Sequence, residues 1–214
     1  RSLHTATRLR DGSVLVVGGR TTVGTASATA ERYATAEDAW VDAPALGTGR
    51  HSHGAVLLDD GSVLIVGGES ANGDALADVA RLAPGAAAWA PSEPMEQARS
   101  HFSLTRLAGG RVLAVGGRSG SSVLASAAVF DPQTETWTAV DPLSEGREGH
   151  AATLMPSGKV LIAGGRTAGG VTSTRLEVFD PATNRFSTID DAPGGGALEA
   201  LALPGGEVLL LGAG

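Results

Sequence analysis

The octapeptide GSVLVVGG at 12–19 returns almost unchanged as GSVLIVGG at 61–68, and again as GRVLAVGG at 110–117 and GKVLIAGG at 158–165. The glycine pairs therefore recur every 48 or 49 residues, and LGAG at 211–214 keeps the period. A fixed period of this length is the signature of a repeat architecture, in which each repeat is one supersecondary unit. The sequence therefore predicts a repeat protein.

Other residue types recur in register with the glycine pairs. Two columns are aromatic, one is arginine and one is mainly histidine, and so many matched columns are hard to produce by chance. The glycine pairs are Gly18-Gly19, Gly67-Gly68, Gly116-Gly117 and Gly164-Gly165; the other columns are Trp40, Trp89, Trp137 and Phe186; Tyr33, Leu82, Phe130 and Phe179; Arg1, Arg50, Arg99 and Arg147; and His4, His53, Phe102 and His150.

Each repeat contains four strand-like segments separated by turns. In the second repeat these segments are HGAVLL (53–58), SVLIVGG (62–68), DVARLA (78–83) and AWAPS (88–92). Four antiparallel strands form a sheet too small to bury both faces alone, so successive sheets must stack, which predicts an all-β protein built as a β-propeller. Glycine at a strand end permits positive φ and close backbone approach. The column of Trp40, Trp89, Trp137 and Phe186 is then expected to be buried between blades.

These residues also resemble a named family. The order R-x-x-[H/F], G-x-V-L-x-x-G-G, an aromatic before Asp-Pro (VFDP at 129–132 and 178–181) and a later Trp is similar to the kelch repeat, in the long bacterial form found around galactose oxidase. The resemblance covers essentially the whole chain and implies the fold, but it says little about function. Two positions depart from the pattern, Leu82 in an aromatic column and Phe102 in the histidine column.

The repeats predict a single kelch propeller domain or fragment over 1–214, with four complete blades and a half blade. The resemblance implies rings of six or seven blades, so about two blades are expected to be missing from the chain or to come from another chain. The last segment, EVLLLGAG at 207–214, would then be an open apolar edge, which predicts self-association or another covering partner. The blade limits are about 1–48, 49–97, 98–145, 146–193 and 194–214.

Composition excludes several classes of function. The net charge of -7 argues against nonspecific binding to nucleic acid, and no apolar run approaches the length of a membrane span. The absence of cysteine excludes disulfides, thiolate metal sites and a cysteine nucleophile. The excess of arginine over lysine suggests a bacterial source, with a secreted or cell-surface location favoured.

Two arginine sets are candidate ligand-binding residues, because guanidinium groups hold carboxylates and phosphates bidentately. One set is the column Arg1, Arg50, Arg99 and Arg147, in the loops that enter the first strands. The other follows the glycine pairs as Arg20, Arg118 and Arg166. Both are expected at one end of the blades, which we call the long-loop face. For the column, a salt bridge between blades or a carbonyl clamp is the structural alternative, and the sequence favours it.

The histidine column is expected to form hydrogen bonds between blades rather than a metal site. His4, His53 and His150 recur on innermost strands, whose side chains point mainly at neighbouring blades, and buried polar groups find partners. The sequence therefore predicts no metal, no cofactor and no catalytic residue. The copper radical chemistry of galactose oxidase is excluded, because it needs a cysteine-linked tyrosine and a second tyrosine, and the chain has no cysteine and only Tyr33.

The resulting prediction is a noncatalytic recognition or scaffold module that binds a protein or an anionic glycan through the long-loop face. Two alternatives stay open at this stage. One is a carbohydrate-active enzyme of the kelch type, epimerase or lyase-like, acting in the channel. The other is a purely architectural segment of a larger secreted protein.

Overall fold

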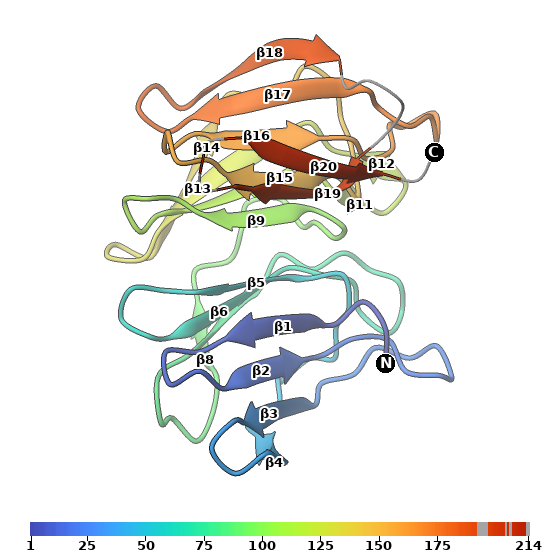
Figure 1. Ribbon diagram of the computed structural model, residues 1–214. Coiled ribbons are helices and arrows are strands. Elements are labelled where there is room, and N and C mark those ends of the chain that lie inside the picture. The colour runs from blue at the N-terminus through green and yellow to red at the C-terminus, as the bar shows by residue number, and fades with distance from the viewer. Residues whose placement is uncertain (192–196, 204, 206, 213–214) are drawn as a thin grey trace. The chain divides into compact units, whose positions relative to one another are not determined.

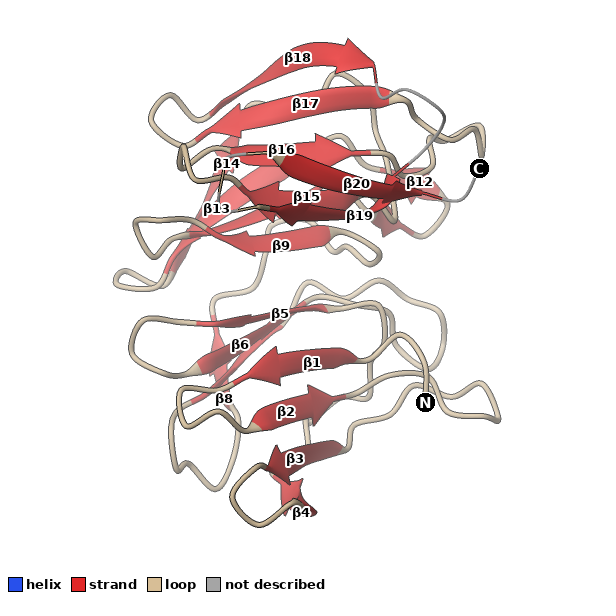
Figure 2. Ribbon diagram, viewed as in Figure 1, coloured by secondary structure: helices blue, strands red, loops and turns tan. Residues whose placement is uncertain are grey.

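The computed structural model describes residues 1–191, 197–203, 205 and 207–212. All regular elements in these ranges are β-strands, and no helix occurs among them (Figure 2). The chain divides into two compact units, Arg1–Ser100 and His101–Gly214. The predicted all-β class is thus confirmed, whereas the expectation of a single domain stays a prediction.

Unit 1 contains two four-stranded antiparallel sheets, which we call blades 1 and 2 (Figure 1). Their strands follow chain order as simple meanders. Blade 1 is β1 (Thr5–Arg8), β2 (Val14–Val17), β3 (Ala30–Ala34) and β4 (Ala39–Ala43), and blade 2 is β5 (Gly54–Leu57), β6 (Val63–Val66), β7 (Val79–Leu82) and β8 (Ala90–Ser92). The four segments expected in the second repeat therefore all form strands.

Unit 2 contains two further four-stranded sheets, blades 3 and 4, and a two-stranded half blade. A short hairpin is inserted between the second and third strands of blade 3. Blade 3 is β9 (Ser103–Arg106), β10 (Val112–Val115), β13 (Ala127–Asp131) and β14 (Thr136–Val140), with the hairpin β11 (Arg118–Ser119) and β12 (Ser122–Val123); blade 4 is β15 (Ala151–Leu154), β16 (Val160–Ala163), β17 (Arg175–Asp180) and β18 (Arg185–Asp191); the half blade is β19 (Ala197–Ala202) and β20 (Val208–Gly212).

Apolar cores lie between consecutive blades within each unit. In unit 1, Leu15 and Val17 of β2 pack with Val63 and Ile65 of β6. In unit 2, Leu113 and Val115 of β10 pack with residues of β16 and β17. The strands β6, β10 and β16 are buried along their whole length. This explains why the second strand of each repeat is a continuous apolar run rather than an alternating one.

The glycine pair and the arginine of the following repeat form the contact that joins one blade to the next. The amide of Gly19 donates to the carbonyl oxygen of Arg50 at 2.8 Å, and Gly68 and Gly117 donate in the same way to Arg99 and Arg147. A β-carbon on Gly18 would lie 2.5 Å from that Arg50 oxygen, and φ at Gly18 is +64°. Both glycines of the pair have positive φ, so no larger residue fits the joint without displacing the next repeat.

We predict that Gly18→Ala lowers the free energy of unfolding by about 2–4 kcal/mol, because the added methyl group meets the Arg50 carbonyl oxygen at 2.5 Å and the buried ring of His53 at 2.8 Å. Gly47→Ala is the matched control, since a β-carbon there meets nothing within 4 Å. Urea denaturation of both variants measures the difference. Equal midpoints for the two variants would contradict the role given to the joint.

The aromatic column differs from the expectation of uniform burial. Trp89 Nε1 donates to Pro44 O of blade 1 at 2.7 Å, and Phe186 packs against the core between blades 3 and 4. These rings therefore face the preceding blade, as expected, although they remain half-buried. Trp40 is 58 % exposed, so its predicted burial is wrong. Its ring packs against Tyr33 on the neighbouring strand β3, with centroids 5.4 Å apart, and this contact leaves most of the residue exposed.

Candidate functional site

The arginine column is bound inside the blades. Arg50 is 2 % exposed, and its guanidinium donates to the carbonyl oxygen of Gly67 at 2.9 Å and pairs with Asp78. The same residue thus holds the glycine carbonyl of its own blade through its side chain and the glycine amide of the preceding blade through its backbone oxygen. The geometry matches the carbonyl clamp considered from the sequence, although the clamp lies within one blade.

Arg147 has the same arrangement with a fuller set of acceptors. Its guanidinium donates to Gly164 O at 3.3 Å and to Arg175 O at 2.8 Å, and it lies 2.8 Å from Glu177 Oε1. The side chains of Arg147 and Glu177 are 0 % and 1 % exposed. Burial lowers the pKa of Arg147, and the carboxylates of Glu177 and Glu145 oppose this shift. The pair is a closed internal contact rather than a fork open to a ligand.

The remaining members of the column are Arg1 and Arg99. Arg1 donates to Gly18 O at 3.4 Å and pairs with Glu31 in a more exposed position. Arg99 is 2 % exposed, and burial lowers its pKa to about 10. The sequence analysis did not identify the acidic partners Asp78 and Glu177. The recurrence of Glu31 and Glu177 at equivalent positions of β3 and β17 was the available signal.

We predict that Glu177→Gln lowers the free energy of unfolding by about 3–5 kcal/mol, because it removes the buried carboxylate that pairs with Arg147 and leaves only the more exposed Glu145 at 3.4 Å. The matched change Glu31→Gln removes the partially exposed equivalent and should cost less than about 1 kcal/mol. Chemical denaturation of the two variants measures both losses. Similar losses would contradict the view that burial distinguishes these two pairs.

The second arginine set lies in the loops that follow the glycine pairs. Arg20 and Arg166 are exposed, and Arg118 is half-buried with its Nε 3.5 Å from Glu148 Oε2. Backbone bonds fix the loops: Arg20 pairs with Ser2, and Arg166 pairs with Glu148, so each loop lies beside the segment that enters the first strand of its own blade. Both arginine sets therefore lie at the same end of each blade, as the meander topology predicted.

Two members of this second set contact one residue of unit 2, Glu148. Glu148 bonds through its backbone to Arg166 and faces Arg118 through its side chain. In blade 2 the residue that directly follows the glycine pair is Glu69 instead of arginine, and its carboxylate lies 3.9 Å from His51 Nε2. The long-loop ends of the blades therefore have mixed charge, with an exposed cation at Arg20 in unit 1 and, in unit 2, an exposed cation at Arg166 and a paired cation at Arg118.

The histidine column forms hydrogen bonds between blades. His53 Nε2 lies 2.8 Å from Thr5 Oγ1 of blade 1, and His150 Nε2 lies 2.8 Å from Ser103 Oγ of blade 3. His4 is exposed. The sequence analysis did not identify the hydroxyl partners, although each directly follows the histidine column in its own repeat. Among the described residues, no cluster of three or more His, Cys, Asp or Glu side chains is arranged to hold a metal ion.

His53 is neutral at physiological pH. Burial lowers its pKa to about 3, and the nearby Arg50, His51 and His4 act in the same direction. An unfolded chain binds a proton at this histidine near pH 6.5, so between about pH 6.5 and 3 the unfolded state holds more protons than the folded state. The stability that His53 contributes is therefore complete above pH 6.5 and is lost as the pH falls.

We predict that the free energy of unfolding falls between pH 7.5 and 5.0 more steeply in the wild type than in His53→Gln. The slope for one histidine is at most about 1.4 kcal/mol per pH unit. Urea denaturation at the two pH values measures it, with His4→Gln as the exposed control. Equal pH slopes for the wild type and His53→Gln would contradict the assignment.

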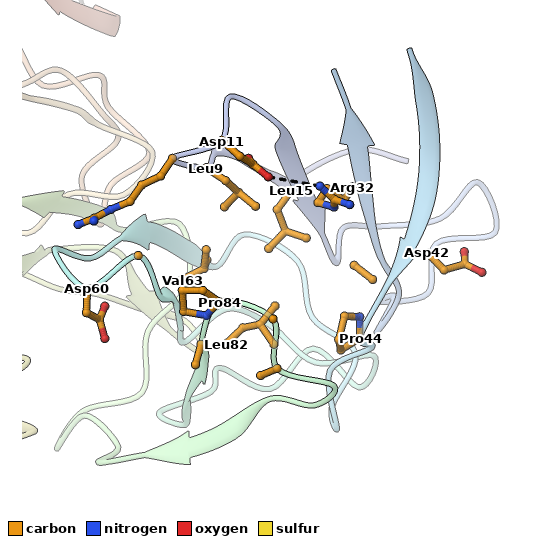
Figure 3. Close-up of a pocket in the computed structure, with 16 residues that line it drawn as sticks. Leu9, Asp11, Leu15, Arg32, Asp42, Pro44, Asp60, Val63, Leu82 and Pro84 are labelled. Atoms are coloured by element: carbon orange, nitrogen blue, oxygen red, sulfur yellow. Dashed lines mark hydrogen bonds and ion pairs between the residues drawn. The ribbon is translucent and has the colours of Figure 1, made fainter. Parts of the chain in front are cut away.

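A cavity of about 610 Å³ lies in unit 1 and is lined by the short turns at Asp11, Asp60 and Pro84 and by Pro44 after β4. The sequence analysis predicted no site there. Its walls come from blades 1 and 2 and include Leu9, Leu15, Val63 and Leu82 (Figure 3). The available signal was Leu82, the one departure from aromatic character in its column.

Four-stranded antiparallel blades joined through glycine and arginine backbones are the construction of a β-propeller repeat protein. The chain belongs to the kelch-repeat family, since the model described as the KLHDC2/KLHL20/DRC7 Kelch-repeats domain matches residues 3–210. The resemblance stated from the sequence is thereby confirmed.

The solved structure of YjhT has the same fold, with a TM-score of 0.73 at 14 % sequence identity. The match covers 92 % of this chain and 68 % of that one. Such low identity shows the fold alone. A search of curated proteins by sequence found no significant match. No helix in the described part of the chain is long and apolar enough to cross a membrane.

Proposed function

We propose that the chain is a noncatalytic recognition module that binds an acidic protein segment or an anionic glycan through its long-loop face. Membership of the kelch-repeat family supports a protein-interaction or scaffold role. The observation that carries the finer proposal is the contrast between the two arginine sets. The column is bound internally at Arg50 and Arg147, whereas Arg20 and Arg166 extend from loops into solvent.

Loops held by a rigid scaffold are the usual place for recognition, because they vary without disturbing the core. Each loop here is pinned by backbone bonds to its own blade, so its side chains are presented at small conformational cost. In unit 2, an anionic group could displace Glu148 from Arg118 and also meet Arg166, since both arginines contact the same residue. This arrangement favours a ligand with a carboxylate, sulfate or phosphate group.

An array of acidic peptides and of uronate-containing or sialylated glycans tests the proposal. The wild type should retain ligands that Arg118→Ala, Arg166→Ala loses by at least tenfold, which is about 1.4 kcal/mol. Arg185→Ala is the matched control, because this exposed arginine starts β18 in the same unit, at the short-turn end of its blade. Binding that survives the double substitution, or that maps to the turn at Asp59 and Asp60, would contradict the long-loop assignment.

We also propose that the edge of the half blade is covered by a second copy of the chain. The support is that β20 pairs only with β19 within the described residues, and that Leu209 and Leu211 of this strand are 46 % and 49 % exposed. An unpaired apolar strand edge recruits another strand. The last two residues of the segment expected to form this edge, 213 and 214, lie outside the described residues.

Sedimentation at micromolar concentration tests the second proposal. The expected result is a dimer that Leu209→Glu, Leu211→Glu shifts toward monomer. Amide exchange across Val208–Leu211 should slow with protein concentration if the edge is paired between copies. A monomer of about 21.4 kDa at all concentrations, with protected amides across this strand, would show that the chain covers its own edge.

A further inference from the structure

The cavity in unit 1 has a largely apolar interior. Leu9 and Leu15 of blade 1 face Val63 and Leu82 of blade 2, and Pro84 closes the same side as Leu82 (Figure 3). At about 610 Å³ it is within the range of pockets that hold small organic molecules. Its lining includes the short turns at Asp11, Asp60 and Pro84 and contains no member of the two candidate arginine sets, so it is distinct from the proposed recognition residues.

The equivalent position in unit 2 shows why the space is open. The set Leu9, Leu15, Val63 and Leu82 corresponds one for one to Leu107, Leu113, Val160 and Phe179 in the repeat register. In unit 2 all four side chains belong to one core cluster, in which Phe179 is 0 % exposed and Leu107 is 2 % exposed. In unit 1, Leu82 and Leu9 are only partly buried. The cavity therefore lies where a phenyl ring fills the matching interface of the same chain.

The cross-strand neighbour of this position is altered as well. Phe179 stacks with Phe186 at a centroid distance of 5.0 Å, and the other aromatic members of the column stack in the same way. Trp89 has no aromatic partner at Leu82; it donates instead to Pro44 O, and the strand β8 begins only at Ala90. Blade 2 therefore lacks the aromatic side chain that the other three blades have at the position of Leu82.

Charges at the mouth indicate which polar group would accompany an occupant. Asp11 accepts from Ser13 and pairs with Arg32 at 3.4 Å, and Asp60 accepts from Ser62 and pairs with Arg81 at 2.6 Å. These two carboxylates are therefore engaged.

Arg10 is the lining cation that forms no ion pair with any described residue. Its side chain lies over Gly61, since a β-carbon there would be 3.5 Å from Arg10 Cδ and 3.6 Å from Nε. The remaining carboxylate, Asp42, is exposed and points away from the apolar walls (Figure 3).

We propose that this cavity binds an aromatic carboxylate, with the ring between Leu82 and Leu9 and the carboxylate on Arg10. The ring replaces the phenyl group that Phe179 supplies in unit 2, and the guanidinium supplies the charge-assisted hydrogen bonds. A neutral or saturated compound of the same size meets only part of this arrangement. The site gives the chain a small-molecule ligand in addition to any partner on the long-loop face.

Ligand-observed NMR with indole-3-acetate tests the proposal on the whole chain. For a ligand of this size, the expected Kd is about 1 mM. Indole-3-ethanol, which lacks the carboxylate, and cyclohexylacetate, which lacks the ring, should each bind at least fivefold more weakly. The backbone amides of Gly61 and Gly85 should shift on addition of indole-3-acetate, because both residues line the cavity.

Four variants locate the site. Leu82→Phe restores the residue type of the column and should abolish binding, whereas Leu82→Met keeps the cavity open and should preserve it. Arg10→Ala should weaken indole-3-acetate at least fivefold while leaving indole-3-ethanol unchanged. Arg20→Ala, on the long-loop face of the same unit, should change nothing.

Clear outcomes would overturn the inference. Binding that persists in a folded Leu82→Phe, amide shifts around Arg20 instead of Gly61, or no binding to the folded wild type at about 5 mM would each do so. If Leu82→Phe does not fold, the Arg10→Ala comparison of the charged and neutral indoles decides the matter alone. Loss of acidic ligands on the array with retained indole-3-acetate binding would separate this site from the proposed recognition face.

Discussion

The hydrogen bond from the second glycine of a pair to the backbone oxygen of the next repeat's arginine, formed by Gly19, Gly68 and Gly117, is the constraint on which the rest of the structure depends. It fixes the chain at the point where one blade ends and the next begins, as between Gly19 and Arg50 or Gly117 and Arg147. The guanidinium of the same arginine holds the carbonyl of its own glycine pair. Arg50, for example, accepts from the Gly19 amide of the preceding blade and donates to the Gly67 carbonyl oxygen of its own blade. Because its guanidinium is buried in this contact, it is not accessible to a ligand.

The two ends of each blade differ as a consequence. At the long-loop end, backbone pairing to the entering strand leaves the loop tips free to vary, and there the second arginine set reaches solvent. At the short-turn end, the carboxylates of Asp11 and Asp60 accept hydrogen bonds within the turn, from the backbone amides of Ser13 and Ser62. The charge at this end is therefore mostly structural, and Arg10, which forms no ion pair with any described residue, is chemically distinct within it.

The sequence predicted the blades well because their signals are periodic and local. Gly18 and Gly67 mark strand ends, and the apolar runs between turns correspond to β2 and β6. It predicted less about contacts between repeats, since these depend on which surface faces which. Trp40 and Trp89 share a column, yet Trp89 donates to Pro44 O of blade 1 whereas Trp40 is exposed. The hydroxyl of Thr5 and the cavity at Leu82 were missed for the same reason, because each is defined by a residue in a different repeat.

The hydrogen bonds between the first strands of neighbouring blades recur every two repeats, whereas the glycine pairs recur in every repeat. Hydroxyls follow the histidine column in the first and third repeats, at Thr5 and Ser103, and the imidazoles that meet them come from the second and fourth, at His53 and His150. Where the residue after the column is Gly54 or Ala151, the next repeat carries Phe102 or Leu198 in place of histidine. The chemical unit is therefore a pair of blades. A chain of this kind that grew or shrank by single blades would place mismatched polar groups at its inner seams, whereas duplication by pairs would preserve every match.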